Sequence, residues 1–147
     1  MKAVQQKWFV IVALAFMLCL AGLIISGTVF AQQCVDNRDG TVTDNGTGLM
    51  WQKATAGPMN WNDAMSYASG LSLGGHSGWR LPTKDELVGL YNSPYKGIMD
   101  VVNDWYWSSS PYAGRSNSVW LVDFNGGFVC YYDVSLNRGV RAVRSAQ

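Results

Sequence analysis

Hydrophobic and polar positions follow two different periods along this chain, and the change of period divides it into segments. Short runs rich in β-branched and aromatic residues predict strands at 41–43, 49–51, 107–109, 119–124, 128–132 and 140–144. Between the second and third of these runs, apolar residues recur at helical spacing. The order of strands, two helices and further strands predicts an α+β domain in which two helices pack on an antiparallel β-sheet.

Capping residues mark where the two helices begin. Asn60 can cap the first helix, with Asp63 three residues later in an arrangement like a capping box. Thr83 and Glu86 form a clearer capping box for the second helix. Ser93, followed by a proline, predicts the end of that helix.

The first 31 residues have the pattern of an export signal. Lys2 and Lys7 precede an uncharged apolar stretch, 8–31, which ends in small residues that suit cleavage before Gln32. An uncleaved membrane anchor is the alternative, because about 20 apolar residues suffice to span a bilayer. Both interpretations predict an exported protein, whether periplasmic, cell-surface or secreted. Contact with the membrane is expected only through residues 8–31, if they are retained.

Cleavage would leave residues 32–147, enough for one domain with its own core. This segment has three Lys and six Arg against ten acidic residues, a net charge of −1. A nucleic-acid partner is therefore not expected, because binding to a polyanion normally needs a basic face. We interpret Arg138, Arg141 and Arg144 as ordinary arginines on the face of a strand.

Two cysteines, Cys34 and Cys130, remain in the segment 32–147. In an oxidising compartment an isolated pair most simply forms a disulfide, which here would close a long loop. Two free thiols are the alternative, because the sequence does not show the geometry that a disulfide needs.

Several motifs in order along the chain resemble the Lcl C-terminal domain family, long catalogued as a domain of unknown function. They lie at 36–52, at Trp61 and the helix after it, and at 79–86, 106–109, 120–124 and 140–144. The resemblance implies a C-type-lectin-like fold over 32–147 and a role in extracellular binding, since the founding member is a surface adhesin that binds sulfated polysaccharide. Ala68 and Ala142 stand where members often carry cysteines. The net charge of −1 argues against carrying over a polyanionic ligand.

No group of residues in the chain forms a catalytic pattern. His76 is the sole histidine and Glu86 the sole glutamate, so a catalytic triad or a zinc site lacks partners. The sequence therefore predicts a protein that is not an enzyme and needs no cofactor.

Acidic and amide side chains near the start of the domain raise the question of calcium. Asp36, Asn37, Asp39 and Asp44 offer oxygen atoms, but their spacing is not that of an EF-hand loop. Asx turns explain the same residues without a metal, and we expect no metal site.

The segment 110–138 contains no Lys and no Glu and is dense in residue types that binding loops use. Its candidate ligand-binding residues are Tyr112, Arg115, Asn117, Asn125, Tyr131, Tyr132 and Asp133. They predict an exported, non-catalytic module that recognises a glycan or a protein. The alternatives are a structural or assembly protein of the cell envelope, or a binding protein whose variable region is diversified by a retroelement.

Overall fold

The computed structural model describes residues 33–102 and 104–147, which form an α+β fold of two helices and two sheets. The first sheet has four antiparallel strands in the order β1 (Cys34–Asp36), β2 (Thr41–Asp44), β3 (Leu49–Gln52) and β9 (Val143–Ser145). The second sheet has five strands in the order β4 (Ala56–Met59), β8 (Arg138–Val140), β5 (Trp105–Pro111), β6 (Ser118–Asp123) and β7 (Val129–Asp133).

The export signal predicted at residues 1–31 lies outside the described residues. Within the described residues, no helix has the length and apolar character needed to cross a membrane.

Both helices begin at the capping residues that the sequence predicts. In α2 (Trp61–Gly70) the side chain of Asn60 accepts a hydrogen bond from the Asp63 amide at 3.0 Å. In α3 (Lys84–Asn92) Thr83 Oγ1 accepts from the Glu86 amide, and the Glu86 carboxylate accepts from the Thr83 amide. A short 3-10 helix, Lys96–Ile98, follows α3.

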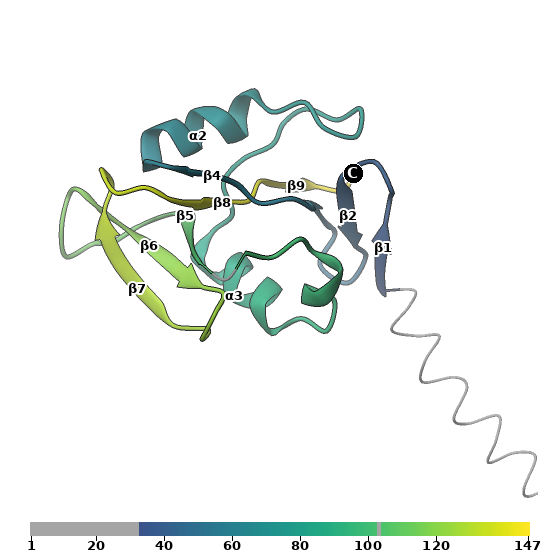
Figure 1. Cartoon of the computed structure of the whole chain (residues 1–147). Helices are drawn as coiled ribbons and strands as arrows, with labels where there is room; N and C mark the ends of the chain where they lie inside the picture. The colour runs from purple at the N-terminus through teal and green to yellow at the C-terminus, as the bar shows by residue number, and fades with distance from the viewer. Residues whose placement is uncertain (1–32, 103) are drawn as a thin grey trace, which may run out of the picture. The chain divides into compact units, whose positions relative to one another are not determined.

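The two helices lie on opposite sides of the strands, as Figure 1 shows. Ala64 and Ala68 of α2 join a buried cluster that includes Trp107 and Leu121. A second buried cluster lies on the opposite face of β5 and β6 and contains Leu87 and Leu90 of α3. It also includes Tyr106 of β5, Val122 of β6 and Trp51 of β3. Because side chains alternate along a strand, β5 and β6 supply apolar residues to both cores.

The predicted antiparallel sheet is correct only in part. β5 and β8 pair in parallel, with Tyr106 opposite Gly139, so the five-stranded sheet is mixed. The single strand predicted at 140–144 is also divided, since β8 ends at Val140 and β9 begins at Val143 in the other sheet.

Arg141 lies where the chain passes from one sheet to the other, and it does not lie on an exposed strand face. It is fully buried. Its guanidinium donates to the backbone oxygens of Gln52, Lys53 and Asp100 and to Thr55 Oγ1. The sequence interpretation was wrong here because a strand-like alternation does not reveal a break at which a side chain turns inward.

The structure does not contain the disulfide predicted between Cys34 and Cys130. Both cysteines are free, Cys34 buried on β1 and Cys130 exposed on β7. These are edge strands of different sheets, so the fold does not bring the two residues together.

We expect the two thiols to react very differently with a thiol reagent. Burial raises the pKa of Cys34 to about 11, with Asp44 and Asp36 adding to the effect. At pH 8 about one Cys34 thiol in a thousand would then be ionised. In a Cys19→Ser variant titrated with Ellman's reagent, Cys130 should react in the native protein and Cys34 only after unfolding. Equal rates of reaction for the two thiols would contradict this prediction.

Candidate functional site

The β6–β7 hairpin and the loop between β5 and β6 bring the candidate binding residues together. Trp120 of β6 lies opposite Tyr131 of β7. The loop closes with a hydrogen bond from the Tyr112 amide to the Ser118 oxygen at 2.9 Å. A second bond, from the Val134 amide to the Asn117 oxygen at 3.0 Å, ties the loop to the residue after β7. The loop therefore has a fixed position beside the hairpin.

Three aromatic rings pack beside this loop, and we call Tyr112, Trp120 and Tyr131 the aromatic cluster. The rings of Tyr112 and Tyr131 are stacked, with centroids 3.7 Å apart and planes 6° from parallel. Trp120 meets both rings edge to face, at 5.1 Å from Tyr112 and 5.8 Å from Tyr131. Each ring restricts the others, so the exposed part of Tyr131 is held in one orientation.

Two cations border the aromatic cluster. The Lys84 ammonium lies 5.3 Å from the centre of the Trp120 ring, and the Arg115 guanidinium lies 5.9 Å from that of Tyr131. Both distances are within the range of cation–π attraction.

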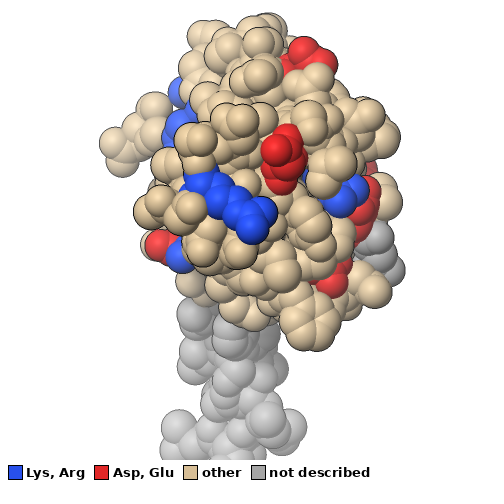
Figure 2. Space-filling model, turned by 90° about the vertical axis from the view of Figure 1, so that its left-hand side faces the viewer, with Lys and Arg blue, Asp and Glu red and all other residues tan. Residues whose placement is uncertain are grey.

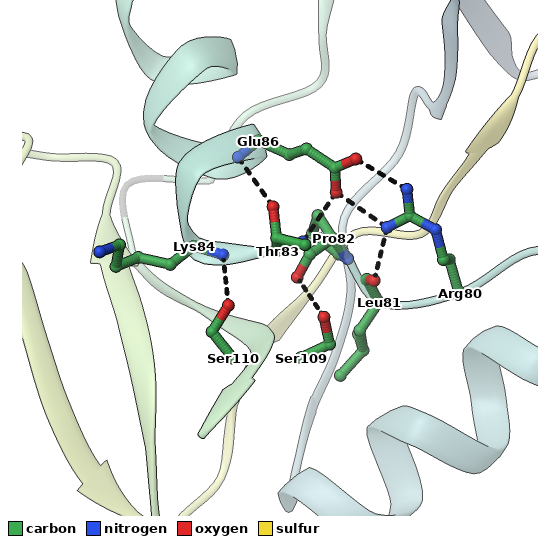
Figure 3. A network of polar contacts seen from close by, with 8 residues as sticks. All are labelled: Arg80, Leu81, Pro82, Thr83, Lys84, Glu86, Ser109 and Ser110. Atoms are coloured by element: carbon green, nitrogen blue, oxygen red, sulfur yellow. Dashed lines mark hydrogen bonds and ion pairs between the residues drawn. The ribbon is translucent and has the colours of Figure 1, made fainter. Parts of the chain in front are cut away.

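The position of Lys84 depends on how the start of α3 is attached to the end of β5, which Figure 3 shows. The Lys84 amide donates to Ser110 Oγ at 3.0 Å, and the Ser109 amide donates to the Pro82 oxygen at 2.7 Å. Arg80 completes the network with two hydrogen bonds to the Glu86 carboxylate, at 2.7 and 2.8 Å. The Arg80 hydrogen bonds lower the pKa of Glu86, which keeps the capping carboxylate charged.

A groove of about 540 Å³ runs next to the aromatic cluster. It is lined by Arg115, Ser116, Asn117, Ser118, Tyr131, Tyr132, Asp133 and Leu136. Figure 2 views the domain from the side that carries β6 and β7, and most of the visible surface is uncharged, with a few isolated basic and acidic side chains. The groove thus offers aromatic contact area and both hydrogen-bond donors and acceptors, without a strong positive or negative electrostatic field.

Tyr132 belongs to the opposite face of β7 from Tyr131, because adjacent residues of a strand alternate. Its ring lies 5.8 Å from that of Trp105, edge to face, and the Arg138 guanidinium lies 5.3 Å from its centre. On each face of β7, therefore, a tyrosine of the strand lies next to a tryptophan and a cation from other parts of the domain.

Six of the seven predicted binding residues are brought together by the fold. Five of them line the groove, and Tyr112 stacks on Tyr131 beside it. Asn125 is the exception, because it lies in the β6–β7 turn, where its amide donates to Asp123 Oδ1. The groove is at the other end of the hairpin, where Ser118 pairs with Asp133.

Sequence reasoning missed three residues of this region. Lys84 and Trp120 were not among the candidate binding residues, and Trp120 is half-buried. Leu136 is exposed and lines the groove. An apolar residue in an otherwise polar loop was the one available signal for Leu136, whereas the place of Lys84 depends on tertiary structure.

Two ionisable groups of the site have shifted pKa values. Hydrogen bonds from Ser135 hold the pKa of the Asp133 carboxyl below its usual range, so it is an anion at neutral pH. The Tyr131 hydroxyl raises the pKa of Tyr112, so that phenol is neutral. At neutral pH the groove therefore presents the Asp133 carboxylate together with Arg115.

The carboxylates considered as calcium ligands, and Asp123 in the proposed site's hairpin, are engaged in local structure. Asp36, Asp39 and Asp44 each accept a hydrogen bond from the amide two residues on, as in Asx turns. Asp123 accepts from two amides of the β6–β7 turn. Across residues 33–102 and 104–147, no three His, Cys, Asp or Glu residues are grouped as metal ligands would be.

Comparison with protein families gives one match. The family model described as the Lcl C-terminal domain covers residues 40–144, which include both sheets' central strands, both helices and the whole groove. Comparison with curated proteins gave no match.

Proposed function

We propose that this chain, which belongs to the Lcl C-terminal domain family, is an exported, non-catalytic binding module. We propose further that its fold is C-type-lectin-like. Its ligand is an extracellular glycan or a protein, and it binds in the groove beside the aromatic cluster. The observation that carries the proposal is the exposed Tyr131 ring, held in place by Tyr112 and Trp120 next to Arg115 and Asn117.

The composition of the groove favours a glycan as the ligand. A fixed aromatic ring provides apolar contact area at a small cost in conformational entropy. Arg115, Asn117 and Asp133 add donors and acceptors that suit hydroxyl groups. The groove holds one arginine beside one carboxylate, so a neutral glycan fits it better than a highly sulfated one.

Tyr131→Ala should weaken ligand binding by about 30-fold or more, the loss typical of a central aromatic anchor. The measurement is a glycan-array screen of the purified full chain, followed by titration of each hit with the variant. Asn125→Ala is the matched control, because Asn125 lies on the same hairpin but away from the groove. It should change affinity by less than about twofold.

Three outcomes would count against this function. Saturable binding that survives Tyr131→Ala would place the site elsewhere. Loss of binding in EDTA would indicate a metal-dependent site. A released product that disappears in Glu86→Gln or Asp123→Asn would indicate a hydrolase, although both carboxylates already serve local structure.

A further inference from the structure

β7 is an unprotected edge of the five-stranded sheet. It pairs with β6 on one side, and within the described residues no strand pairs with its other side. All five of its residues are exposed, and Asp133 is the only charged one. Edge strands are usually protected by lysine, proline or a bulge, because their free backbone groups pair readily with another strand. β7 has none of these.

The hydrogen-bond pattern shows which backbone groups are directed outward. The Asp123 amide donates to the Phe128 oxygen and the Val134 amide donates to the Asn117 oxygen, so the even-numbered residues bond to β6. In an antiparallel pair the bonded positions alternate along the strand. The amide and carbonyl groups of Val129, Tyr131 and Asp133 are therefore directed away from the sheet.

The exposed apolar residues of this edge are symmetric about Cys130. Their exposed fractions are 67% for Phe128, 38% for Val129, 37% for Tyr131 and 38% for Tyr132. An identical antiparallel strand centred on Cys130 would place Val129 opposite Tyr131 and Phe128 opposite Tyr132, each pair formed twice. Val129 and Tyr131 both have outward backbone groups, so these pairs would be hydrogen-bonded. The two Cys130 residues would face each other at a position without hydrogen bonds.

Neighbouring registers match less well. Centring on Tyr131 would place Val129 opposite the Asp133 carboxylate, and centring on Val129 would place Tyr131 opposite Gly127. In the register centred on Cys130, Asp133 lies opposite Gly127, and no like charges on this edge meet. Cross-strand pairs of aromatic and β-branched residues stabilise a sheet, so this register is the favoured one.

We propose that two copies of the chain associate through antiparallel pairing of their β7 strands, centred on Cys130. The result is one continuous ten-stranded sheet with a two-fold axis at its centre. The inference does not rest on the proposed ligand, because the pairing uses the outward backbone edge of β7.

The register can be tested by cysteine crosslinking of the full chain in a Cys19→Ser background. Diamide, which accepts the two electrons and two protons that a pair of thiols gives up, should crosslink Cys130 to Cys130. In a Cys130→Ser background, Phe128→Cys and Tyr132→Cys are prepared separately. A mixture of the two should crosslink at least about tenfold faster than either alone, since only the mixture places the new thiols opposite each other.

Association without a covalent bond is tested by sedimentation under reducing conditions. The chain should sediment as a dimer, and Val129→Lys should shift it to a monomer by placing a charge in each of the paired strands. Val35→Lys is the matched control, because Val35 is 43% exposed on β1, an edge strand of the other sheet, and it should leave the dimer intact. Circular dichroism verifies that each variant is folded.

Two results would overturn the inference. One is a reduced chain that sediments as a monomer at the concentrations used for crosslinking. The other is a mixture of Phe128→Cys and Tyr132→Cys that crosslinks no faster than the separate variants, which would indicate random collision of exposed thiols.

Discussion

Replacing Arg141 with alanine should remove most of the free energy of unfolding of the domain. The side chain is fully buried and donates to four acceptors, three of them backbone oxygens. Each buried acceptor left without a partner costs about 1–3 kcal/mol, so the total loss should exceed about 4 kcal/mol. Small domains typically have only about 5–15 kcal/mol to lose.

The shape of the guanidinium explains why lysine should not replace it. Nη1 donates to Gln52 O and Lys53 O, while Nη2 donates to Thr55 Oγ1 and Asp100 O at 3.0 Å each. An ammonium has one nitrogen and cannot occupy both positions. Burial lowers the pKa of Arg141, but a guanidinium stays charged in proteins. The dipoles of its four acceptors stabilise that buried charge.

Urea unfolding followed by tryptophan fluorescence tests this prediction. Arg141→Lys should lose about 2 kcal/mol or more, and Arg141→Ala the most. Arg115→Ala removes an exposed arginine and should change the free energy of unfolding by less than about 0.5 kcal/mol. A midpoint for Arg141→Ala within error of the parent would show that the buried network contributes little.

Replacing Asp44 with asparagine should destabilise the domain by about 2–3 kcal/mol at neutral pH. The residue is 2% exposed, and its carboxylate accepts from the Gly46 and Thr47 amides, Thr47 Oγ1 and the Tyr95 hydroxyl. Asparagine places an NH₂ donor where one oxygen now accepts from two hydroxyl groups.

The pH dependence of stability gives a second readout for Asp44. Burial acts to raise its pKa, but hydrogen bonds from Thr47 and Tyr95 outweigh it, and the folded-state pKa lies below the ordinary value. A lowered folded-state pKa means that stability is fully present above the unfolded pKa of about 3.9 and is lost as the pH falls below it.

In urea melts between pH 7 and pH 2.5, Asp44→Asn should show a smaller loss of stability on acidification than the parent. The loss should not vanish, because Asp36, Asp39 and Glu86 also have lowered pKa values. Asp85→Asn, with a side chain 88% exposed, should follow the parent curve. Parallel curves for Asp44→Asn and the parent would contradict the assignment.

Local signals in the sequence predicted much of this fold. The caps at Asn60 and Thr83 were correct because each depends on residues within three positions of one another. The strands predicted at 119–124 and 128–132 leave only three residues between them for a turn, and Gly127 in that turn adopts a positive φ of 76°. Strand positions such as Trp51 and Trp107 followed from apolar runs and are buried.

What the sequence did not reveal depends on how distant segments meet. The break between Val140 and Val143 has no turn residues of its own, because it is stabilised by the buried Arg141 and not by local chemistry. The predicted disulfide assumed proximity that the two-sheet arrangement does not provide. Within the candidate site, composition identified the segment, but only the register of β6 and β7 separates Asn125 from the groove.

The division of residues 138–145 between two sheets has a consequence for the order of folding. β8 pairs with both β4 and β5, and β9 pairs with β3, so neither sheet is complete until this late segment is in place. The widest of these pairings joins Leu49 to Ser145, and the hydrogen bond from Arg141 to Gln52 is almost as long in sequence. A polypeptide emerging amino end first from a ribosome could therefore complete neither sheet until residue 145 had emerged.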